Sequence, residues 1–217
     1  MELSVEWPGV LDPEVLQTSY IEESNCLADA AKSGRWSEVL QLLDSSVRLN
    51  VNQWRIGGSS WFTVLHQAAW LGAPLDVVRE LLDRGAWRSL RNAAGERPVD
   101  IARARGHSRL LNTLAIREPG EAEQRKFAAW DLHLAELIAE QTRRLPPVAF
   151  REVPTEVIAL EGLEDLWFAY PGMYGGFSLS IYKDRLFVES WSRVVAGSGQ
   201  AHVITESGCA LVEEGFV

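Results

Sequence analysis

Residue types that commonly carry chemistry are scarce in this sequence. Only two of its 217 residues are cysteine, and four are histidine. Cys26 and Cys209 lie far apart and in no metal-ligand spacing, which excludes a disulfide framework and a cysteine-based zinc site. We therefore expect no metal and no cofactor, and a reducing, cytoplasmic environment.

Long apolar runs and catalytic motifs are also missing. No stretch of 18 apolar residues occurs, and the first ten residues lack the basic and apolar regions of a signal peptide, so we expect no membrane partner. No serine lies in a Gly-x-Ser-x-Gly elbow, and no pair of carboxylates stands out as an acid and a base. We assign no catalytic residue and predict that the protein is not an enzyme.

Lysine is rare, but acidic residues and tryptophan are plentiful. The net charge is -9, which argues against a nucleic-acid partner, and there are nine tryptophans, which indicate a large core, a binding surface or both. The first 26 residues contain six acids and no base, whereas residues 27–150 are mildly basic. We therefore treat residues 1–23 as a separate acidic N-terminal segment.

The middle of the chain contains an internal repeat. Asp100 follows His66 by 34 positions, and Gly106 follows Gly72 by the same distance. Around each glycine the pattern predicts two short helices joined by a tight turn. Single repeats of this kind cannot bury their apolar faces alone, so the units must stack.

These residues resemble the ankyrin repeat. Residues 63–66, Thr-Val-Leu-His, are similar to the Thr-Pro-Leu-His of that family, with Val64 in place of proline. Gly85-Ala86 matches its closing step, and residues 97–100 form a more degenerate copy. The resemblance implies about three repeats over residues 24–117 and a protein-binding role.

The rest of the chain changes character twice. Residues 118–145 predict one long helix that caps the repeats or links them to the C-terminal region, because Pro119 and acids begin it and Pro146-Pro147 end it. Residues 146–217 predict a small antiparallel β module, with Lys183-Asp184 as a hairpin turn. The expected fold class is α+β.

This tail also carries a resemblance. Residues 167–177 and 189–202, like residues 54–74, are similar to segments of a group of bacterial ankyrin-repeat proteins of uncharacterised function. The likeness implies a bacterial origin and an architecture, and no activity.

The candidate binding residues are tryptophans and arginines in the loops and helix starts of the repeats, the residue types that dominate protein interfaces. They are Trp54, Arg55, Trp61, Trp70, Trp87, Arg88 and Arg91. An alternative interpretation is that Trp54 and Trp61 fold back onto the core of their own repeat. The sequence favours a protein-interaction module, for example an immunity or antitoxin protein that blocks a toxin. It leaves the oligomeric state open.

A second candidate site lies in the β module, where aromatic and polar residues are dense. If the hairpins fold together, a small pocket would gather Tyr174, Trp191, Arg193, Gln200 and His202. The alternative interpretation is a hydrogen-bond network that holds the sheet to the helices. Such a pocket would make the protein a small-ligand binder or an enzyme.

Overall fold

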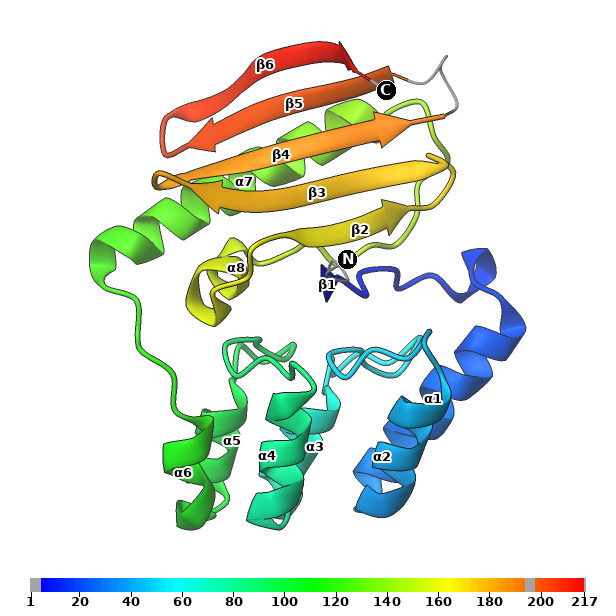
Figure 1. The fold of residues 1–217 in the computed structure, drawn as a ribbon, viewed down its shortest axis with the longest axis vertical. Helices are drawn as coiled ribbons and strands as arrows, with labels where there is room; N and C mark the ends of the chain where they lie inside the picture. Colours follow the sequence, from blue (N-terminus) through cyan, green and yellow to red (C-terminus); the bar gives the residue numbers. More distant parts are fainter. Residues whose placement is uncertain (1–4, 194–197, 217) are drawn as a thin grey trace. The chain divides into compact units, whose positions relative to one another are not determined.

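The computed structural model describes residues 5–193 and 198–216, and the chain divides into two compact units (Figure 1). One unit spans Asp12–Arg117 and is helical, and we call it the helical unit. The other combines Met1–Leu11 with Glu118–Val217 and contains the sheet, and we call it the sheet unit. The N-terminal segment is thus divided between the units at Leu11 and does not stand apart.

The helical unit is built from three consecutive helix pairs, preceded by one short 3-10 turn. Within each pair the two helices contact each other, and the first helices of neighbouring pairs also lie side by side. The elements are η1 (Pro13–Val15), α1 (Thr18–Lys32), α2 (Trp36–Ser45), α3 (Val64–Leu71), α4 (Leu75–Asp83), α5 (Pro98–Ala104) and α6 (Ser108–Leu114).

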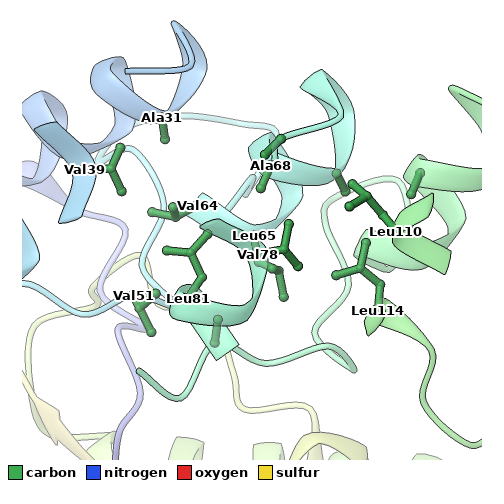
Figure 2. Packing of buried hydrophobic residues seen from close by; sticks show 14 of the residues in the cluster. Ala31, Val39, Val51, Val64, Leu65, Ala68, Val78, Leu81, Leu110 and Leu114 are labelled. Carbon is green, nitrogen blue, oxygen red and sulfur yellow. The ribbon is translucent and has the colours of Figure 1, made fainter. Parts of the chain in front are cut away.

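One apolar cluster runs through all three pairs (Figure 2). Val78 and Leu81 on α4 are fully buried, as the spacing of the apolar stripe predicts. Ala68 and Ala69 on α3 are buried as well, and their small side chains let neighbouring helices approach closely. Burial of about 25 cal/mol per Å² of apolar surface makes this shared cluster the main source of stability for the unit.

The sheet unit contains a six-stranded sheet in the order β1-β2-β3-β4-β5-β6. Its strands are β1 (Val5–Glu6), β2 (Leu166–Tyr170), β3 (Gly175–Tyr182), β4 (Arg185–Ser192), β5 (Ser198–Thr205) and β6 (Gly208–Phe216). The expectation of an antiparallel module holds for β2 to β6 only. β1 pairs parallel to β2, with Val5 opposite Leu166, so the sheet is mixed.

The predicted hairpin turn is confirmed. β3 ends at Tyr182 and β4 begins at Arg185. Lys183 and Asp184 have φ of 47° and 60°, so both adopt the left-handed conformation of the two-residue turn that suits a twisted hairpin.

One face of the sheet is covered by helices. α7 (Glu121–Thr142) contacts β5 and β6, and α8 (Thr155–Glu161) contacts α7 and β3. The apolar side of α7, with Phe127, Trp130 and Leu134, is buried, and α7 belongs to the sheet unit. That residues 118–145 cap the repeats or link them to the C-terminal region stays a prediction. Side chains that point away from α7 form what we call the outer sheet face.

Candidate functional site

The start of α3 is held by a hydrogen-bonded pair of side chains. The main-chain N–H of Thr63 donates to Nδ1 of His66 at 3.3 Å, and the Thr63 hydroxyl oxygen accepts from the N–H of His66 at 3.4 Å. The other ring nitrogen, Nε2, lies 3.3 Å from the carbonyl of Glu96, to which it donates. His66 therefore closes the cap of α3 and connects it to the next loop through the carbonyl of Glu96.

Asp100 caps the start of α5 in the way that His66 caps the start of α3, 34 residues earlier. Its carboxylate accepts the main-chain N–H of Arg97 at 3.0 Å, at the start of α5. A carboxylate thus replaces an imidazole at the position 34 residues further on, because either group can accept the otherwise unpaired N–H at a helix start.

The end of α3 is held by contacts with His107. Gly72 has φ of 63°, and a Cβ there would lie 2.5 Å from Nδ1 of His107. His107 therefore lies directly over Gly72, and its Nε2 donates to the carbonyl of Trp70 at 3.2 Å. The last turn of α3, which carries Trp70, is fixed from both sides.

Trp70 lies at the centre of an aromatic and cationic surface. The guanidinium of Arg105 lies 4.3 Å from the centroid of the Trp70 ring, and Phe62 meets the same ring edge to face at 6.0 Å. Trp70 keeps 42% of its surface exposed, and Arg105 is exposed too. We call Phe62, Trp70 and Arg105 the Trp70 surface; it combines the residue types that contribute most to protein interfaces.

Two of the predicted binding tryptophans are not on the surface. Trp54 is only 2% exposed and Trp87 only 3%. Trp54 forms a β-bridge with Thr63, and the N–H of Trp87 donates to Oδ1 of Asn52 at 2.8 Å. The loops fold back on one another, so these two indoles pack inside the unit, as the alternative interpretation states for Trp54.

The other predicted binding residues of the helical unit are half-buried, and the arginines among them bond to groups of the same chain. Arg55 pairs with Asp29, Arg88 donates to the carbonyl of Ala115 at 3.4 Å, and Arg91 donates to that of Gly95 at 2.9 Å. These three arginines are half-buried, as is Trp61 with its φ of 52°. Their guanidinium groups hold loops in place.

Arg105 and Phe62 were not predicted as site residues. Stacked repeats bring equivalent positions together, and Arg105 falls one position beyond the residue that aligns with Trp70. That offset near 34 is the signal in the sequence from which Arg105 could have been found.

The second candidate site does not gather as expected. Gln200 and His202 point from β5 toward α7, whereas Trp191 is on the outer sheet face. Because successive side chains of a strand alternate between faces, a pocket containing all of them cannot form. Tyr174 is 77% exposed, and Arg193 is exposed at the end of the described segment.

Trp191 instead stacks on Trp167. The two rings lie 4.4 Å apart and nearly parallel, at 15°. Gly176 lies between them in the sheet, and a Cβ there would lie 2.5 Å from the Trp167 ring. The glycine leaves room on β3 for the indoles to meet above it.

Gln200 and His202 belong to the inner side of the sheet. Gln141 on α7 donates to Oε1 of Gln200 at 2.9 Å, and Gln200 donates in turn to Glu214 at 3.0 Å. Burial lowers the pKa of His202, and nearby Glu214 opposes that effect. This part of the site fits the alternative interpretation, a network that holds sheet to helix.

A hollow of about 610 Å³ with a mixed polar and apolar lining includes Gln141, Gln200 and Glu214 of this network. The end of α7 contributes Arg143 and Arg144, and the sheet contributes Ser190 and Ser192. Ser192 donates to the carbonyl of Met173 at 3.0 Å, and Met173 and Leu145 supply the apolar part of the lining. We call this hollow the α7 cavity.

Metal-binding and membrane-spanning features are absent from the described residues. Within residues 5–193 and 198–216, no cluster of histidine, cysteine and carboxylate side chains could hold a metal ion. No helix in this part of the chain is long and apolar enough to cross a membrane. The glycine-rich segment 196–199 is only partly described, since residues 196 and 197 lie outside the described part.

When the chain is compared with known proteins, no family model and no curated protein matches it.

Proposed function

We propose that residues 24–117 form a short ankyrin-repeat stack that binds a protein partner through the Trp70 surface. The observation that carries the proposal is the Arg105 guanidinium, held 4.3 Å over the exposed Trp70 ring. Three helix pairs, equivalent caps at Thr63 and Arg97, and the shared apolar cluster support the repeat assignment.

The Trp70 surface is preorganised for binding, because contacts within the chain already hold its side chains in place. His107 fixes the main chain at Trp70, and Phe62 packs against the ring. Rigid side chains lose little conformational freedom on binding, so more of the contact energy appears as affinity. We expect the partner to cover the indole with an apolar side chain and to offer Arg105 a carboxylate or carbonyl oxygen.

The test compares Trp70→Ala and Arg105→Ala with wild type. Affinity capture from the source organism, read by mass spectrometry, identifies the partner, and calorimetry with the purified partner measures binding. We expect each change to weaken binding by about 2 kcal/mol, or roughly thirtyfold. Tyr174→Ala removes an exposed aromatic from the sheet unit and serves as the matched control. Wild-type affinity of a Trp70→Ala/Arg105→Ala double variant would rule the surface out.

An immunity or antitoxin role is a narrower form of this proposal. It draws support from charge, because the sheet unit has 18 Asp and Glu against 8 Lys and Arg, whereas the helical unit is nearly neutral. An acidic body attracts a basic partner and speeds its association. In that case the captured protein is toxic to cells, and co-expression of wild type, but not of Trp70→Ala, restores growth.

A second candidate function is binding of a small polar ligand in the α7 cavity. The supporting observation is its lining, which combines Arg143, Arg144, Ser190 and Ser192 with the carboxylates of Glu140 and Glu214 around a hollow of about 610 Å³. A thermal-shift screen of metabolites tests it. A ligand that stabilises wild type and loses its effect in Arg144→Ala, but not in the control Arg125→Ala, supports this function. We propose no catalytic step for either site.

A further inference from the structure

The α7 cavity carries charges of both signs. Its lining includes two guanidinium groups, those of Arg143 and Arg144, and two carboxylates, those of Glu140 and Glu214. Arg143 and Glu140 form an ion pair at 2.7 Å, three positions apart at the end of α7. These two charges neutralise each other, so Arg144 and Glu214 determine which charged ligand the cavity favours.

Arg144 and Glu214 have no oppositely charged partner in the described part of the chain. Arg144 forms no ion pair with any residue in 5–193 or 198–216. Glu214 accepts a 3.0 Å hydrogen bond from the neutral amide of Gln200, and no guanidinium or ammonium group of the same residues pairs with it. A ligand with one cationic and one anionic group can pair with both.

A ligand of a single sign fits this lining less well. An anion such as phosphate would pair with Arg144 but would be repelled by Glu214. Helix α7 ends at Thr142, beside the cavity, and the partial negative charge at the end of a helix adds to that repulsion. A purely cationic ligand would in turn be repelled by Arg144.

The uncharged lining offers a hydroxyl and an apolar wall. Ser190 is only 2% exposed, and its hydroxyl donates to the carbonyl of Gln200 at 3.5 Å, so its oxygen can still accept from a ligand N–H. Met173 and Leu145 form the apolar part of the lining. The volume of about 610 Å³ falls within the range of small-ligand sites.

We infer that the α7 cavity binds an α-amino acid with an apolar side chain in its zwitterionic form. The inference rests on the ligand-binding function proposed for this cavity. Glu214 and the Ser190 hydroxyl receive the ammonium group, and Arg144 pairs with the carboxylate. Met173 and Leu145 contact the apolar side chain.

Calorimetry with blocked ligands tests the zwitterion. The twenty common amino acids are titrated singly into the full chain, and apolar ones should bind. For each one that binds, the N-acetyl derivative removes the ammonium charge and the carboxamide removes the carboxylate charge. We expect each derivative to bind about tenfold more weakly. Equal affinity of either derivative and the free amino acid would overturn the inference.

Charge-neutral variants test the two residues. Glu214→Gln removes the charge but keeps an oxygen for the hydrogen bond from Gln200. This change and Arg144→Gln should each weaken binding of the amino acid about five- to tenfold. Glu164→Gln and Arg125→Gln are the matched controls, because both residues are exposed and lie outside the lining. Wild-type affinity in Glu214→Gln and Arg144→Gln would overturn the inference.

The same titrations separate the zwitterion from the cavity itself. If no amino acid binds at roughly 10 mM, the inference is wrong. Inorganic phosphate and neutral sugars are then titrated in the same way. If one of them binds and loses affinity in Arg144→Gln, the cavity remains a ligand site with another ligand class. If none binds, and the metabolite screen finds no ligand either, the proposed function of the cavity fails as well.

Discussion

The indole Nε1 of Trp7 donates a 2.6 Å hydrogen bond to the main-chain carbonyl of Arg151, 144 residues further along the chain. The Arg151 guanidinium lies 5.3 Å from the same ring. Both residues are buried, and burial lowers the pKa of Arg151 to about 10. This contact fastens the N-terminal strand to the sheet, which is why the two ends of the sequence form one unit.

Trp7→Ala should destabilise the sheet unit strongly. The change removes a large buried side chain and leaves the Arg151 carbonyl without its donor, at a cost of about 3–5 kcal/mol. Trp7→Phe keeps most of the apolar contact and should cost about 1–3 kcal/mol. Urea unfolding followed by circular dichroism measures both. A Trp7→Ala variant as stable as wild type would show that the strand is not held this way.

Local signals in the sequence predicted much of the fold. Repeat spacing located the paired helices, and Lys183-Asp184 located the hairpin. β1 and α8 were missed. β1 has two residues, too few to show alternation, and its partner Leu166 is 161 positions away from Val5. Pairing at such a distance depends on tertiary packing and leaves no local pattern.

The candidate site was predicted only in part for a similar reason. Residue type indicated that tryptophans in the loops and helix starts could bind; Trp70 does lie exposed, but in the last turn of α3. Type alone does not distinguish an exposed indole from a buried one. Trp87 is buried, and its main-chain N–H donates to Asn52 in a neighbouring loop, a contact between loops that the sequence does not reveal.

Asn52→Ala should destabilise the helical unit. Asn52 donates to the carbonyl of Gly85 at 2.9 Å and accepts from the main-chain N–H of Trp87, so its loss removes one hydrogen bond from each of two main-chain groups. We expect a cost of about 2–3 kcal/mol in the free energy of unfolding. Asn112→Ala changes an exposed asparagine on α6 and should fall within about 0.5 kcal/mol of wild type. Equal stability of the two variants would contradict the role given to Asn52.

Asp184→Gly should stabilise the hairpin. Glycine adopts the φ of 60° without the strain that a side chain brings, and this gain exceeds the loss of an exposed ion pair with Lys126. We expect a net gain of about 0.5–1 kcal/mol in thermal or urea unfolding. Asp184→Asn removes the charge but keeps a turn-forming side chain, and so isolates the ion pair. A loss of stability in Asp184→Gly would show that the ion pair outweighs the strain.

His202 should make the sheet unit sensitive to mild acid. Burial among Val188 and Leu211 lowers the pKa of its imidazole below the ordinary 6.5, and its Nδ1 finds no hydrogen-bond partner among the described residues. As pH falls through 6.5, the imidazole becomes protonated in the unfolded chain but stays neutral in the folded chain, so the free energy of unfolding decreases. The decrease should level off once pH passes below the pKa of His202 in the folded chain, where the imidazole is protonated in both states. Urea unfolding at intervals from about pH 7.5 to 5 measures this effect. The slope of the free energy of unfolding against pH should correspond to a difference of roughly one bound proton at most between the unfolded and folded states. His202→Gln removes the titration and should show a shallower pH dependence over this range. Parallel pH profiles for the variant and wild type would mean that another group is responsible.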